Sequence, residues 1–199
     1  MNLKHRQVLV TVLGINVVTF LVMVAGAALS GSSSLLSGTL DNLGDALTYA
    51  LSLLVVGSAP VVKARVAFFK GLLILGAACL VATHIIWRLH DLDTPVFESM
   101  GIAAALNLGA NLVCLRLLFP YRNDDVNMAS MWECSRNDIA DGLAVIAATL
   151  AVWIFESGWP DVLIAGVLLL VFLRSALRVL GRARRELSTP TTAPPLHTP

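Results

Sequence analysis

Six long apolar windows constrain this chain more than any other feature. They cover residues 8–29, 36–59, 67–87, 97–118, 131–155 and 161–180, each long enough to cross about 30 Å of hydrocarbon as a helix. Hydrophobic residues make up 57% of the 199 residues and charged residues only 14%, a balance that ordinary water-soluble domains do not show. The sequence therefore predicts an all-α membrane protein, a bundle of six transmembrane helices joined by short loops.

The basic residues predict how this bundle lies in the membrane. Of the 14 Lys and Arg residues, all except Arg88 and Arg136 fall on the side that carries both chain termini. Because cytoplasmic loops are enriched in Lys and Arg, we expect both termini in the cytoplasm. The first apolar run is longer than a signal-peptide core, so we interpret it as an uncleaved span. We expect an integral protein of a bacterial inner (plasma) membrane.

One domain is expected to fill most of the chain. Residues 1–187 form the predicted six-span domain, and residues 188–199 form a Pro- and Thr-rich tail that we expect to be disordered. The net charge of +1 gives no reason to expect a nucleic-acid partner, so the lipid bilayer is the expected environment. The sequence has no P-loop, GxSxG or HExxH motif, which argues against an ATP-driven pump and against an enzyme.

Two carboxylates interrupt the second apolar window. Asp41 and Asp45 are one helical turn apart, so they project from the same face of the helix. A charged residue at the centre of a bilayer costs about 2.5–3.5 kcal/mol on insertion scales, so such residues pair, take up a proton or line a polar pathway. Paired carboxylates suit a divalent cation, and either a cation or a proton relieves their repulsion. Metal and proton are therefore expected to compete for this pair.

A second polar stripe lies in the fifth window. Cys134, Asn137, Asp138 and Asp141 share one helical face, and the sequence predicts that acids from the two windows converge on one cation. A thiolate beside a carboxylate suits borderline or soft ions such as zinc or cadmium. Two other interpretations stay open. The cysteine could be an inert core residue, and Arg136 could instead neutralise an acid in a salt bridge.

These features resemble the transmembrane domain of the cation diffusion facilitator family of metal/proton antiporters. In that family, span two carries D/H-x-x-x-D and span five carries H/D-x-x-x-D, which together form a tetrahedral metal site. The stretch Asp41-Asn-Leu-Gly-Asp45 fits the first motif. We find no counterpart of the family's ferredoxin-like cytoplasmic domain in this sequence. A homodimer, if one forms, is therefore expected to pack through membrane spans.

Two registers of span five are consistent with the family pattern. When residues 132–145 are aligned on W-L-H-x-x-x-D-x-x-x-S-x-G-V, the metal-binding places fall on Cys134 and Asp138. A shift of three residues gives Asn137 and Asp141 instead. We prefer the first register because the downstream small residue and valine then also agree. In either register the family's usual histidine is replaced, so the metal preference of the histidine form does not carry over.

The resemblance implies proton-coupled export of a divalent transition metal, with zinc as the expected ion and no permanently bound cofactor. The metal ligands implied in this way are Asp41, Asp45, Cys134 and Asp138. The alternative metal ligands or supporting residues are Asn137, Asp141 and Asn111, the last of which lies in the fourth window. A function of another class stays open: a non-transporting membrane subunit whose buried acids pair with basic residues of a partner protein.

Overall fold

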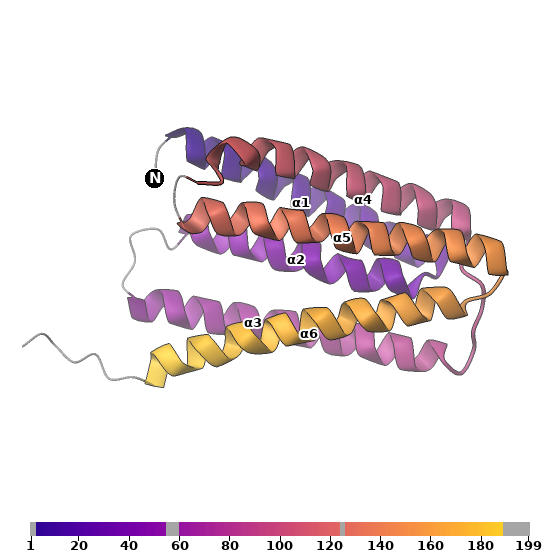
Figure 1. Ribbon diagram of the computed structural model, residues 1–199. Helices are drawn as coiled ribbons and strands as arrows, with labels where there is room; N and C mark the ends of the chain where they lie inside the picture. Colours follow the sequence, from indigo (N-terminus) through magenta and orange to yellow (C-terminus); the bar gives the residue numbers. More distant parts are fainter. Residues whose placement is uncertain (1–2, 55–59, 124–125, 189–199) are drawn as a thin grey trace, which may run out of the picture.

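The computed structural model describes residues 3–54, 60–123 and 126–188, and the described residues form six long α-helices (Figure 1). The all-helical bundle predicted from the sequence is confirmed. The last residues of the predicted 36–59 window and residues 189–199 of the predicted tail lie outside the described residues. The helices are α1 (Leu3–Ser30), α2 (Ser33–Leu54), α3 (Pro60–Arg88), α4 (Phe97–Leu118), α5 (Val126–Phe155) and α6 (Trp159–Ser188), with a short 3₁₀ helix, η1 (Phe119–Tyr121), after α4.

Proline and glycine mark several helix ends. Pro60 is the first residue of α3 and Pro160 the second of α6, positions where the missing N–H of proline has no intrahelical acceptor to lose. Gly31 joins α1 to α2 with a φ of 69°, a left-handed conformation that favours glycine. At Gly158, a Cβ atom would lie 2.5 Å from the carbonyl oxygen of Asp93. Glycine therefore allows the α5–α6 turn to pack against the α3–α4 loop.

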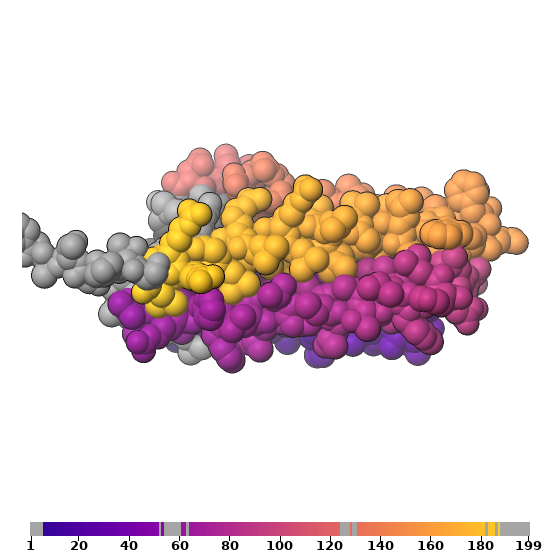
Figure 2. All heavy atoms as spheres, turned by 90° about the horizontal axis from the view of Figure 1, so that it is seen from below, coloured from indigo at the N-terminus to yellow at the C-terminus, as the bar shows by residue number. Residues whose placement is uncertain are grey.

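Helices three apart in the chain lie next to each other. Figure 1 shows α1 beside α4, α2 beside α5 and α3 beside α6, with the α2/α5 pair between the other two. Seen from below, α3 and α6 lie side by side along the bundle and cover one face (Figure 2). The start of α1 and the end of α6 lie at the same end of the bundle. Residues on the facing sides of α2 and α5 therefore lie in the interior.

The described helices differ in how apolar they are. All except α2 contain a stretch long and apolar enough to cross a membrane. At about 1.5 Å of rise per residue, the 22 residues of α2 are also long enough, but this helix is rich in polar residues. It contacts α1, α3, α5 and α6, so its polar side chains face protein rather than lipid. The outer surface carries exposed apolar side chains, including Leu21, Leu80, Leu106, Leu163 and Leu170. The chain is thus a helical membrane protein.

Apolar clusters hold α2 in place on both sides. Leu40 of α2 packs in one cluster with Ile74 of α3 and Phe172 of α6. A second cluster joins α1, α4 and α5 to the first turn of α2, through residues such as Met23 and Val145. Burial of each such side chain contributes about 1.5–3 kcal/mol relative to water, although lipid lowers this advantage. Between these clusters, the facing sides of α2 and α5 carry Asp45, Cys134 and Asp138.

Candidate metal site

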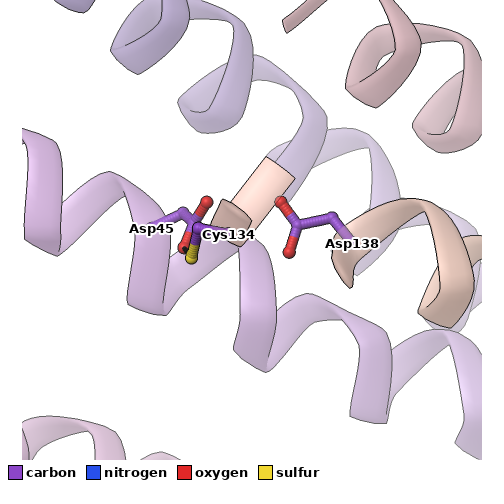
Figure 3. Close-up of side chains that lie close together, drawn as sticks. All are labelled: Asp45, Cys134 and Asp138. Atoms are coloured by element: carbon purple, nitrogen blue, oxygen red, sulfur yellow. Dashed lines mark hydrogen bonds between the residues drawn. The ribbon is translucent and has the colours of Figure 1, made fainter. Parts of the chain in front are cut away.

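Asp45, Cys134 and Asp138 converge in the interior of the bundle (Figure 3). One ligand atom from each residue can be chosen so that all three atoms lie within 4.8 Å of one another. Asp45 is on α2, whereas Cys134 and Asp138 are one turn apart on α5, so both face the same neighbour. The two carboxylates are 5% and 7% exposed, respectively. This cluster, called the thiol site below, therefore lies away from water.

Hydrogen bonds to Asp45 hold the thiol site together. The Cys134 Sγ donates to Asp45 Oδ1 at 2.8 Å, and the Tyr49 hydroxyl donates to Asp45 Oδ2 at 3.1 Å. The Asp45 and Asp138 carboxyl groups also lie within hydrogen-bonding reach of each other. Two carboxylates so close cannot both stay charged without a shared proton or a cation between them. The arrangement is therefore suited to exchange one for the other.

Asp41 lies one turn along α2 from the thiol site. It is half-buried, and its carboxyl group is within hydrogen-bonding reach of Asp141 on α5. Because α2 and α5 are antiparallel, Asp41 and Asp141 form a second acid pair beside Asp45 and Asp138. The four acids thus form a short ladder between the two helices, in which Asp41 is not part of the closest three-residue cluster.

The residues of the alternative span-five register occupy different environments. Asn137 is exposed on α5, whereas Asp141 is half-buried and faces Asp41. Asn111 of α4 is 2% exposed and lines a small cavity that it shares with Asp138 and Asp141. The structure thus places Cys134, Asp138 and Asp141 toward α2, and Asn137 on the outer side.

The nearby basic residues do not form the salt bridge that the sequence left open for Arg136. Arg136 is exposed, and its guanidinium lies over the Trp132 ring, 5.3 Å from the ring centroid. It does not pair with Asp41 or Asp45. Lys70 of α3 is half-buried and donates a hydrogen bond to Thr48, three residues after Asp45 on α2. Its ammonium group therefore approaches the thiol site from the α3 side.

Sequence reasoning missed three polar groups around the site. Tyr49 follows Asp45 by four residues, so the helical spacing that singled out Asp41 could also have found it. Asn42 donates to Asn107 Oδ1 at 2.8 Å and links α2 to α4. Lys70 had no local signal, because its approach depends on how α3 packs against α2.

The donor set of the thiol site has a clear chemical preference. One sulfur and two carboxylates suit a borderline divalent ion such as zinc, which takes four ligands in tetrahedral geometry. Three protein ligands leave one position for a further donor, and Asp41 is the next carboxylate along α2. A calcium-like ion needs 6–8 oxygen ligands, so this set does not suit it.

Comparison with known proteins gives one family match. A model of the cation efflux transmembrane domain matches residues 62–188, which run from α3 to the end of α6. The matched segment contains Cys134, Asp138 and Asp141, whereas α2 with Asp41 and Asp45 precedes it. None of the curated proteins compared with the chain matches it.

Proposed function

Because the chain belongs to the cation efflux family, we propose that it exports a divalent transition metal ion, zinc, in exchange for protons. Transport of metal cations is the function of the family, so the chain is a membrane transporter rather than an enzyme. We propose that Asp45, Cys134 and Asp138 bind the exported ion, with Asp41 as the fourth ligand.

One observation carries this proposal: a thiol and two carboxyl groups meet inside a membrane bundle. Carboxylates inside a membrane bundle need a counter-charge or a proton. Arg136 does not supply the counter-charge, because its guanidinium lies over the Trp132 ring. Sulfur among the donors favours zinc or cadmium over magnesium or calcium. The position between α2 and α5, in the middle pair of helices, also suits an ion that must pass through the bundle.

Exchange of protons for the ion follows from the chemistry of these ligands. Cysteine binds zinc as a thiolate and aspartate as a carboxylate, so binding releases the protons these groups carry. On the other side of the membrane, protons return to the same groups, lower the affinity and release the ion. The groups titrate together, so their proton affinities belong to the cluster rather than to single residues. A proton gradient can drive export in this way.

The non-transporting alternative predicts a different arrangement of the acids. Basic residues of a partner protein would have to reach them, yet Asp45 and Asp138 face each other inside the bundle and are almost fully buried. A partner approaching from the lipid would meet apolar side chains first. The observed burial therefore favours an internal cation.

Transport by purified protein in sealed vesicles tests the proposal. We expect Asp45→Ala and Asp138→Ala each to abolish uptake of zinc driven by an imposed pH difference. Glu133→Gln, which neutralises an exposed carboxylate on the same helix, is the matched control and should transport normally. Undiminished zinc-for-proton exchange in both alanine variants would rule out this site.

A further inference from the structure

Lys70 of α3 places a positive charge beside the thiol site. Its ammonium group donates a hydrogen bond to the hydroxyl of Thr48, which follows Asp45 by about one turn on α2. The charge also interacts electrostatically with Asp45 and Cys134. A lysine near the end of a membrane span usually extends toward the membrane surface. The Lys70 side chain turns into the bundle instead, so its charge is part of the surroundings of the thiol site.

Packing of α3 against two helices directs Lys70 toward α2. Ile74 follows Lys70 by four residues and shares its face of the helix, and a Cβ atom added at Gly44 of α2 would lie 3.9 Å from Ile74. The next residue after Lys70 is Gly71, where an added Cβ atom would lie only 2.6 Å from Leu180 of α6. Glycine at this position lets α3 and α6 approach closely. Contacts outside the thiol site therefore fix the direction of Lys70.

Thr48 holds the ammonium group short of the acids. Its hydroxyl donates to the carbonyl oxygen of Gly44 at 2.6 Å and accepts the hydrogen bond from Lys70. The hydrogen bond of Lys70 thus goes to a neutral hydroxyl rather than to a carboxylate. The long, flexible stem of a lysine lets its ammonium group move by about one helical turn, which is the step from Thr48 to Asp45. A cation therefore stands beside the thiol site without filling it.

A fixed positive charge beside a cation site lowers the affinity of that site. Like charges repel over several ångströms, and the repulsion is strong where water is excluded. An ion that passes through a membrane protein must bind well enough to enter and weakly enough to leave. Two acids and a thiolate without any opposing charge would hold a divalent ion tightly. A lysine that only joined α3 to α2 would leave the metal affinity unchanged, which separates the two roles by experiment.

We propose that Lys70 is a built-in competing charge that sets the affinity of the thiol site for its ion, and that Thr48 limits how strongly it competes. This inference rests on the proposed function, because it concerns the affinity for the exported ion. Thr48 follows Asp45 toward the end of α2, so Lys70 lies on the side of the thiol site that faces the chain termini (Figure 1). An ion that enters from that end passes this charge before it reaches the acids.

Calorimetric zinc titration of the purified full chain in lipid nanodiscs tests the role of Lys70. We expect Lys70→Met to tighten zinc binding by about tenfold or more, because the charge is lost and most of the side-chain volume is kept. Lys70→Arg keeps the charge and should bind zinc much as the wild type does. Arg65→Gln removes an exposed charge from the same helix and is the matched control, with unchanged affinity.

Thr48→Val should have the opposite effect. The valine keeps the shape of the side chain but removes the acceptor, so the ammonium group is free to pair with Asp45. We expect zinc affinity to fall by about threefold or more. In the double variant with Lys70→Met this loss should disappear, because no ammonium group is left to compete. Comparison of the two single variants with the double variant isolates the coupling between the two residues.

Zinc affinity that is unchanged or weaker in Lys70→Met, while wild-type binding is still lost in Asp45→Ala, would overturn the role of Lys70 and leave the proposed function in place. Absence of zinc binding by the wild type would overturn both. A loss in Thr48→Val that persists in the double variant would show that Thr48 acts through packing of α2 and not through Lys70. Should Lys70→Met fail to fold, Lys70→Gln makes the same comparison with a polar side chain.

Discussion

Two buried acids of this bundle, Asp161 and Asp45, are treated in opposite ways. Asp161 of α6 is 0% exposed and accepts three hydrogen bonds, from the Ser32 hydroxyl at 2.6 Å and from the backbone N–H groups of Ser33 and Ser34 at 2.7 and 2.9 Å. Because α2 begins at Ser33, the charge also faces the positive end of that helix. Asp45 is almost as buried but faces another acid, Asp138.

The difference separates an acid that holds the fold together from acids that are available for binding. At Asp161, neutral donors satisfy the carboxylate and fasten the start of α6 to the start of α2. At Asp45, the donors are one thiol and one phenol, and the neighbouring acid adds acceptors rather than donors. Buried polar groups are normally satisfied, so a cluster with surplus acceptors indicates a site that awaits a cation.

The largest expected effect is on metal affinity at the thiol site. Asp45→Asn or Asp138→Asn should weaken zinc binding by more than about 100-fold, because loss of a direct ligand exceeds the loss caused by a supporting residue. Neither variant should lower stability, since each removes one of two facing acids. Calorimetric zinc titration and thermal unfolding in detergent measure the two quantities. A variant that keeps wild-type affinity would show that the acid is not a ligand.

Asp161→Ala should have the converse effect. It leaves the N–H groups of Ser33 and Ser34 buried without an acceptor, so we expect the free energy of unfolding to fall by about 2–4 kcal/mol. Zinc affinity of the folded protein should stay at the wild-type value, because Asp161 contacts the start of α2 and not the thiol site. Denaturant titration and calorimetry test this. If Asp161→Ala instead lost zinc affinity and kept wild-type stability, Asp161 would not have the purely structural role that distinguishes it from Asp45.

Cys134→Ser should change which ion binds. The hydroxyl can still donate to Asp45, but the soft sulfur ligand is lost, so we expect zinc and cadmium affinity to fall by about tenfold with little change for Mn²⁺. Competition titrations with the three ions measure this selectivity. An equal loss for all three would mean that the residue acts through packing rather than as a ligand.

Tyr49→Phe is the smallest expected effect. It removes one donor from Asp45 and leaves the ring in place, so zinc affinity should change by about tenfold at most. The direction is informative: weaker binding means that the phenol orients the carboxylate, whereas tighter binding means that it competes with the ion. Calorimetry beside a Tyr121→Phe control makes the measurement. An unchanged zinc affinity would show that the Tyr49 hydroxyl has no part in binding.

Helical periodicity was enough to predict the bundle and the facing stripes. Apolar windows gave the helices, and the spacing of Asp45 from Asp41 and of Asp138 from Cys134 placed each pair on one face. Spacing within one helix does not show which residues of two neighbouring helices lie at the same level along the bundle. The structure therefore sets Asp45 beside Cys134 and Asp138, and sets Asp41 beside Asp141, a division that the sequence left open.

Contacts between distant helices were also beyond sequence reasoning. Nothing near Asp161 in the sequence reveals that Ser32 donates a hydrogen bond to it across the bundle. The same holds for Lys70, which reaches Thr48 from α3. Such contacts depend on how helices cross, which local periodicity does not encode.

Protection of Cys134 from alkylation tests the central claim most directly. In a Cys79→Ser, Cys114→Ser background, Cys134 is the only cysteine that reacts with a thiol reagent. The account predicts that zinc slows its modification, that magnesium does not, and that Asp45→Asn and Asp138→Asn abolish the protection. Modification at the same rate with and without zinc would contradict the claim that this thiol and these acids bind the transported ion.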